Sequence, residues 1–130
     1  MFCSHNLLMA GLLLMAAASA EEGGMYDGLW RATFIGTSGS SLSAKVVLKG
    51  ASGTWVTASD RAHIAGRFPC IGPQFPIVIQ SSSADELKFE VDAKSAVKGC
   101  GRWEITANPA DSKTLQGKFK DGRPITFVKQ

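Results

Sequence analysis

Apolar and polar residues alternate along much of the chain after residue 28, with the period of two that is typical of half-buried β-strands. Residues 42–49 show this best, because Leu42, Ala44, Val46 and Leu48 fall on one side and mostly polar residues on the other. Similar segments, bounded by turn residues, predict strands at 29–35, 42–49, 54–58, 76–80, 87–92, 102–107, 114–120 and 124–129. One apolar face per strand favours an antiparallel sheet, since strands of parallel sheets are buried on both faces.

The segments between these strands are rich in glycine, serine, proline and aspartate, which are turn formers. Asp121-Gly122 predicts a tight hairpin, because both residues tolerate a positive φ. Pro124 is expected to open the last strand or to lie on an edge, because proline cannot donate a ladder hydrogen bond. We therefore predict an all-β fold, a small antiparallel up-and-down β-barrel of about eight strands, with a β-sandwich as the alternative. Closure is favoured because a closed barrel exposes no edge strands.

Gly28-Leu29-Trp30 at the start of the first predicted strand resembles the Gly-x-Trp sequence that opens lipocalins and avidins, which are calycin-type exported β-barrels. The resemblance covers these three residues and the strand pattern. In those families the tryptophan closes the barrel floor, often beneath an arginine from a late strand. The resemblance thus implies this role for Trp30, with Arg102 or Arg123 as the arginine. It concerns the fold and not a ligand, because the later lipocalin motifs and avidin's biotin-binding residues are absent.

The first twenty residues have the pattern of an export signal. An apolar run of about 12 residues, from Leu7 to Ala18, is shorter than the roughly 20 residues that span a bilayer. The small residues Ala18-Ser19-Ala20 follow, as at a signal cleavage site. We predict a cleaved signal peptide at 1–20 and a single β domain at 21–130, periplasmic or secreted, without a stable membrane span. An uncleaved anchor or a buried helix is the alternative, since no Lys or Arg precedes the run.

Two cysteines remain after this cleavage, Cys70 and Cys100, each in a stretch rich in glycine or proline. In an exported domain such a pair predicts one disulfide. A bridge that closes a loop of about 31 residues stabilises the fold by roughly 3–4 kcal/mol in the chain-entropy description. A redox or metal pair is the alternative, but residues 21–130 contain no Cys-x-x-Cys motif and one histidine, so we predict no metal site and no cofactor.

Charge and motifs narrow the functional classes. The chain has 14 Lys and Arg against 11 Asp and Glu, a net charge of +3, with no dense basic stripe, so no nucleic-acid partner is expected. This mild bias is typical of a solvated face; the alternative is a location near anionic envelope lipid or polysaccharide. We do not expect an enzyme, because no Gly-x-Ser-x-Gly elbow is present and the acids Glu90, Asp92 and Glu104 fall on the polar faces of their strands.

The least regular segment, 59–76, holds the remaining histidine, two arginines and three prolines. Long, constrained loops often carry function, so we predict an anion or sugar site formed by Arg61, His63 and Arg67 beside Trp55. The alternative is a rigid crossover with solvated arginines. Trp55 itself lies among threonines and valine, and its pattern does not decide between core and surface.

These observations lead to one preferred function and one alternative. The preferred function is a non-catalytic binding module of the cell envelope or exterior, with a small apolar or sugar-like ligand or a partner protein that it inhibits. The alternative is a structural or interaction protein with a filled core. Large side chains fill a small eight-stranded barrel when they pack together, which favours a surface site over a deep cup. The candidates for such packing are Trp30, Phe34, Phe89, Trp103, Phe119 and Phe127.

Overall fold

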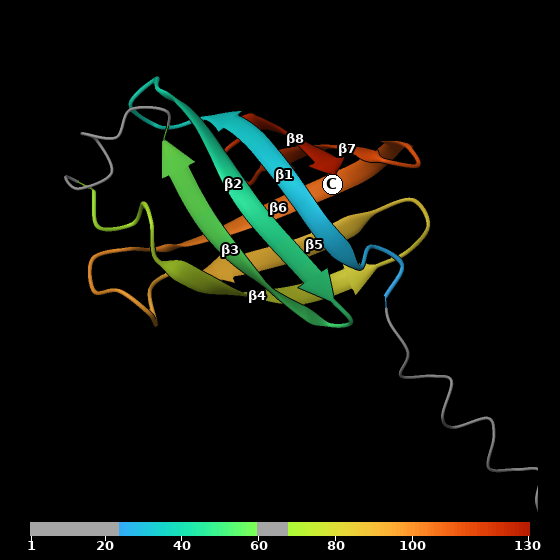
Figure 1. Ribbon diagram of the computed structural model, residues 1–130, viewed down its shortest axis with the longest axis horizontal. Coiled ribbons are helices and arrows are strands. Elements are labelled where there is room, and N and C mark those ends of the chain that lie inside the picture. Colours follow the sequence, from blue (N-terminus) through green and yellow to red (C-terminus); the bar gives the residue numbers. More distant parts are fainter. Residues whose placement is uncertain (1–23, 60–67) are drawn as a thin grey trace, which may run out of the picture.

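A computed structural model describes residues 24–59 and 68–130, and these residues form eight strands and no helix (Figure 1). The strands are β1 Gly28–Ile35, β2 Ser41–Lys49, β3 Ser52–Ser59, β4 Gln74–Ser82, β5 Leu87–Asp92, β6 Arg102–Asp111, β7 Thr114–Phe119 and β8 Pro124–Lys129. Every predicted strand is present; the largest difference is that β6 continues to Asp111. The predicted signal peptide, 1–20, lies outside the described residues, and within them no helix is long and apolar enough to cross a membrane.

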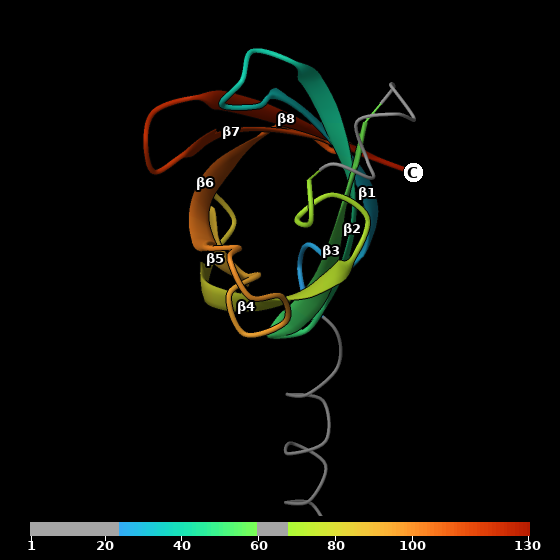
Figure 2. The ribbon, with the colours of Figure 1, turned by 90° about the vertical axis from the view of Figure 1, so that its left-hand side faces the viewer.

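The strands form a closed antiparallel barrel in which each strand pairs with the next and β8 pairs with β1. The closing ladder runs from Trp30 opposite Lys129 to Phe34 opposite Ile125. Seen along its axis, the sheet makes one continuous ring (Figure 2). The predicted up-and-down barrel is confirmed and the sandwich alternative is wrong. Pro124 is the first residue of β8, as its missing N–H requires.

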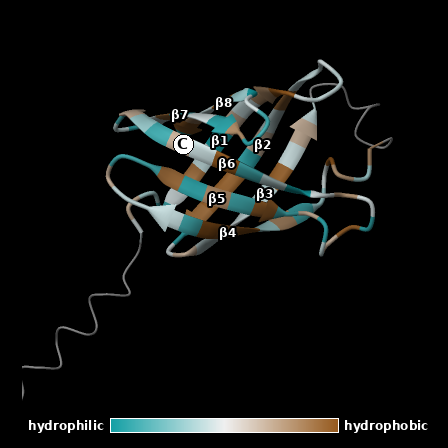
Figure 3. Cartoon of the chain, turned by 180° about the vertical axis from the view of Figure 1, so that it is seen from behind, coloured by the Kyte–Doolittle hydropathy of each residue, from teal (hydrophilic) through white to brown (hydrophobic). Residues whose placement is uncertain are grey.

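Side chains fill the interior of the barrel, because the pleat directs every second residue of each strand inward. Figure 3 shows this alternation as brown and teal residues along β5. The largest fully buried side chains are aromatic, Trp55, Phe75, Phe89 and Phe127. Two of them are register partners, since Trp55 lies opposite Phe75. This packing leaves no deep, lipocalin-like cup in the part of the barrel that the structure describes.

The two ends of the barrel differ, and we name them floor and mouth. The floor carries the turns at 50–51, 83–86 and 112–113. Trp30 is buried there, its Nε1 donates to the backbone oxygen of Tyr26 at 2.9 Å, and the ammonium of Lys129 lies 5.6 Å from its ring centroid.

The cation beside Trp30 is Lys129, and the expectation of Arg102 or Arg123 in that position is wrong. The strand directions explain this difference. Arg102 opens β6 and Arg123 directly precedes β8, and both of these strands start at the mouth. Lys129 ends β8 and so reaches the floor.

Candidate ligand pocket at the barrel mouth

The mouth is bordered by four connections, 36–40, 68–73, 93–101 and 120–123, the second of which is described only from residue 68. The predicted disulfide is confirmed: Cys70 and Cys100 are bonded, with their Cα atoms 5.8 Å apart. On the other side, the N–H of Gly72 donates to the backbone oxygen of Thr57 at 2.9 Å. Residues 68–73 are therefore held between β3 and the 93–101 connection, across one side of the mouth.

A pocket of about 220 Å³ lies inside this rim. It is lined by Phe34, Gly36, Thr37, Leu42, Trp55, Thr57, Cys70, Ile71, Trp103, Phe119 and Arg123. Its aromatic rings contact one another, with centroids 5.2 Å apart for Phe34 and Phe119 and 6.0 Å apart for Trp55 and Trp103. The volume lies between the roughly 150 Å³ of an apolar cavity that holds benzene and the roughly 300 Å³ at which drug-sized sites begin. A molecule of one or two rings fits this space.

Two indole nitrogens are buried at the pocket and differ in their hydrogen bonding. Trp55 Nε1 donates to Thr57 Oγ1 at 2.7 Å. Trp103 Nε1 is buried and has no hydrogen-bond partner among the described residues. A buried donor without an acceptor costs about 1–3 kcal/mol, so an acceptor that reached it would be favoured.

Arg123 places a fixed cation at the pocket rim. Its guanidinium carbon lies 4.3 Å from the ring centroid of Phe119, and its Nη1 donates to the backbone oxygen of Ile35 at 2.8 Å. Its Nε donates to Asp121 Oδ2 at 2.8 Å. The hydrogen bonds from the backbone N–H and then the side chain of Arg123 hold the pKa of Asp121 below its usual value. Asp121 is thus ionised at neutral pH and keeps Arg123 in place.

The structure places the predicted site residues unevenly. Trp55 is fully buried and forms part of the pocket lining, so it is a core residue that also borders the mouth. Arg61, His63 and Arg67 lie outside the described residues, and their site with Trp55 stays a prediction. No group of three potential metal ligands lies together within 24–59 and 68–130.

Apart from Trp55, none of the lining residues was predicted to bind a ligand. The alternation assigns Phe34 and Trp103 to the core, and Arg123 was expected only as the arginine near Trp30. For Arg123 a signal exists in the sequence. It follows the Asp121-Gly122 hairpin. Because successive strands alternate in direction, the hairpin between β7 and β8 lies at the mouth, and Arg123 lies there with it. Glu90 and Glu104 lie opposite each other on the outer face, as predicted for the polar side of their strands.

Comparison with known proteins supports the fold. The sequence matches no protein-family model and no curated protein. In structure it is similar to a protein described as a de novo design of a fluorescence-activating β-barrel, with a TM-score of 0.50 and 18% sequence identity. The match covers 81% of this chain and 94% of the designed chain. At this identity the similarity concerns the fold alone, an eight-stranded antiparallel β-barrel.

Proposed function

We propose that this protein is an exported, non-catalytic binding module whose mouth pocket takes one small aromatic molecule that carries an anionic or hydrogen-bond-accepting group. The observation that carries the proposal is the 220 Å³ aromatic pocket at one end of an otherwise filled barrel. Apolar pockets with a few placed polar groups are the usual form of small-molecule sites. The similar designed barrel is described as fluorescence-activating, and a binding role is compatible with this fold.

The shape of the interior limits the ligand. Trp55 and Phe89 are fully buried in the barrel, with ring centroids 6.5 Å apart, and they block access toward the floor. A long acyl chain therefore has no channel to enter. Aromatic rings stack or meet edge to face at centroid distances of 4.5–7 Å, as the rings of Phe34, Phe119 and Trp103 already do, so a ligand ring extends an existing cluster.

The polar groups at the pocket select among small rings. Arg123, whose Nε is hydrogen-bonded to Asp121, presents its guanidinium at the rim. Trp103 Nε1 is a buried donor without a partner among the described residues, and a ligand reaches it only if the ring of Trp103 moves. Both favour an acceptor or an anion on the ligand. A sugar is less well matched, because it needs many hydrogen bonds and the lining offers few polar side chains, chiefly the hydroxyls of Thr37 and Thr57.

A non-catalytic role is part of the proposal. The acids Glu90, Asp92 and Glu104 are not among the lining residues of the mouth pocket. Glu90 and Glu104 line a separate hollow on the outer face, which borders the same Trp103, Phe119 and Arg123. Asp92 is engaged by Arg102, whose Nε lies 3.2 Å from its Oδ1. The pocket thus lacks, among its described lining residues, a carboxylate pair that could work as acid and base on a bound molecule.

Thermal-shift titration with benzoate and with benzylamine tests the proposal, since these probes share one ring and differ in the sign of their charge. We expect benzoate to stabilise the protein, by about 2.7 kcal/mol at 100 times its dissociation constant, and benzylamine to have a much smaller effect.

A pair of matched variants locates the binding. Thr37→Phe places a bulky ring at the pocket and is expected to abolish the benzoate shift. Ser112→Phe makes a similar change in an exposed turn at the floor and is expected to preserve it. The proposal is wrong if neither probe shifts the melt, or if Thr37→Phe and Ser112→Phe bind benzoate equally.

A further inference from the structure

Charge is distributed very unevenly around the barrel. Strands β1 to β4 contain three basic residues, Arg31, Lys45 and Lys49, and no Asp or Glu. Strands β5 to β8 contain four basic and four acidic residues. The three ion pairs found among the described residues all lie in β5, β6 and the turn before β8. Strands β5 to β8 are therefore charge-balanced, and the charged residues of β1 to β4 are all cations.

Among strands β1 to β4, the outer side chains of β1 and β2 are arranged in rows. In each row one residue of β1 lies directly opposite one residue of β2, and the rows follow one another along the strands at about 7 Å, which is twice the rise per residue. The rows are Leu29 with Val47, Arg31 with Lys45, and Thr33 with Ser43. We call these six residues the β1–β2 face. From the floor toward the mouth it is apolar, then basic, then hydroxylic.

The basic row is unfavourable in the isolated protein. Arg31 and Lys45 are exposed cations in directly opposite positions, and like charges so placed destabilise a sheet. The barrel contains a second like-charged pair, Glu90 opposite Glu104, but there the ammonium of Lys88 lies 3.8 Å from Glu104. No ion pair among the described residues relieves Arg31 and Lys45 in this way. An external anion would do so.

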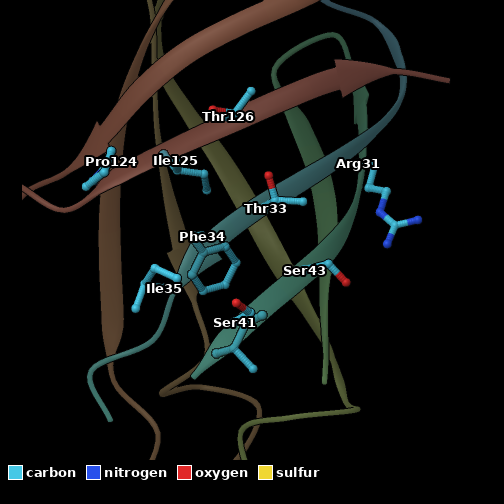
Figure 4. Close-up of a pocket in the computed structure, with 10 residues that line it drawn as sticks. Arg31, Thr33, Phe34, Ile35, Ser41, Ser43, Pro124, Ile125 and Thr126 are labelled. Carbon is cyan, nitrogen blue, oxygen red and sulfur yellow. The ribbon is translucent and has the colours of Figure 1, made fainter. Parts of the chain in front are cut away.

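The surface around the basic row is open and partly apolar. Leu29 and Val47 are 39% and 37% exposed, and Val128, the β8 partner of Arg31, is 44% exposed. Two shallow hollows, of about 470 and 400 Å³, share Arg31 and Ser43 in their linings. Figure 4 shows the second, with Thr33 and Ser43 on neighbouring strands and Arg31 further along β1. Each hollow has room for a phosphate-bearing headgroup.

We propose that the β1–β2 face docks the protein on an anionic phospholipid surface. Leu29 and Val47 lie at the boundary between headgroups and acyl chains, Arg31 and Lys45 bind the phosphates, and the hydroxyls of the third row bind headgroup oxygens. This role is additional to the mouth pocket, which is formed mainly by other residues.

The composition of the face favours lipid over two other anionic partners. A soluble polyanion would bind to the basic row, but its binding would give no role to the apolar row beside it. A protein partner is usually anchored by large aromatic side chains, and the exposed apolar residues of this face are aliphatic. Aliphatic side chains next to lysine and arginine are typical of surfaces that lie in a membrane interface.

Flotation of the protein with vesicles tests the proposal. We expect binding to vesicles that contain phosphatidylglycerol, weaker binding as the salt concentration rises, and no binding to pure phosphatidylcholine. Arg31→Gln with Lys45→Gln is expected to weaken binding about 25-fold, since each cation near such a surface contributes about a factor of five. The control, Lys118→Gln with Lys120→Gln on and just after β7, removes the same charge and is expected to change binding less than threefold. Equal losses in both variants, or no binding to the anionic vesicles, would overturn the proposal.

A second pair of variants tests the apolar row. Leu29→Thr is expected to weaken vesicle binding, whereas Val78→Thr, on β4 and 53% exposed, is expected to leave it unchanged because Val78 lines neither hollow. Inorganic polyphosphate serves as the soluble probe. If it binds through Arg31 and Lys45 while Leu29→Thr has no effect on vesicles, the face is a polyanion site and the proposal is wrong. All variants should melt at or near the parent temperature, because the substituted side chains are exposed.

Discussion

The hydrogen bond between Trp55 Nε1 and Thr57 Oγ1 joins the barrel core to the mouth pocket, and a double-mutant cycle can measure it. Both residues are buried, at 0% and 6% exposure, and the donor–acceptor distance is 2.7 Å. Trp55→Phe removes the donor and part of the ring system. Thr57→Val removes the acceptor and preserves the shape of the side chain. Together, the two changes remove both partners of the bond.

The expected magnitudes follow from burial. Trp55→Phe removes roughly three buried heavy atoms, worth about 2 kcal/mol, and leaves the Thr57 hydroxyl unpaired, which adds about 1 kcal/mol. Thr57→Val leaves the indole N–H unpaired and costs about 1.5 kcal/mol. The double variant loses the carbon contacts but leaves neither group unpaired, so we expect a cost of about 2.5 kcal/mol. The coupling free energy is then about 2 kcal/mol.

Urea unfolding followed by far-ultraviolet circular dichroism, with the disulfide intact, measures all four proteins. This signal does not depend on the tryptophan that is replaced. The slope of the free energy of unfolding against urea should stay constant through the cycle, since the same surface is exposed in each case. Costs that add to within about 0.5 kcal/mol would refute the reasoning, because independent sites behave in that way.

Two further predictions concern the disulfide and the response to acid. Replacing Cys70 and Cys100 together by serine is expected to lower the free energy of unfolding by about 3–4 kcal/mol, as measured by urea denaturation without reductant. Mass spectrometry that found two free thiols in the parent protein, kept without reductant, would contradict the bridge. Acid is expected to destabilise the barrel through Asp121, Asp92 and Asp111, whose pKa values are lowered in the folded state. A lowered pKa adds stability above the unfolded value of 3.8, and this stability is lost as the pH falls through the folded value. The melting temperature should therefore decrease at pH values below about 4. Asp121→Asn should make this decrease shallower in calorimetric scans. An unchanged acid dependence in that variant would show that the turn with Asp121 does not contribute.

Most of the fold can be predicted because the strand pattern is local. The alternation in 42–49 and the Asp121-Gly122 hairpin each identify an element without knowledge of the rest of the chain. The Cys70–Cys100 bridge was also predictable, because both cysteines lie in Gly- or Pro-rich segments between strands. The end of β6 could not be predicted. The strand continues to Asp111 through a register shift after Pro109, and the alternation of apolar and polar residues does not indicate such a shift.

The candidate site is harder to predict because it depends on register and on strand direction. Trp55 lies among residues that do not alternate clearly, and its pairing with Val46 and Phe75 places it inward. Trp103 and Arg123 are far apart in sequence and meet at the mouth only when β6 and β8 start at the same end. The strand directions likewise place Lys129, at the end of β8, at the floor beside Trp30.

The closing ladder between β1 and β8 has a consequence for how the protein folds. Every other ladder joins strands that are neighbours in sequence, whereas the β1–β8 pairing joins residues from opposite ends of the described chain. Because contacts between residues far apart in sequence form slowly, we expect this ladder to form late in folding. Until β8 docks, the sheet has two open edges and the core aromatics lie beside them, which is the state most prone to aggregate. The arrival of β8 removes both edges at once and seals the core.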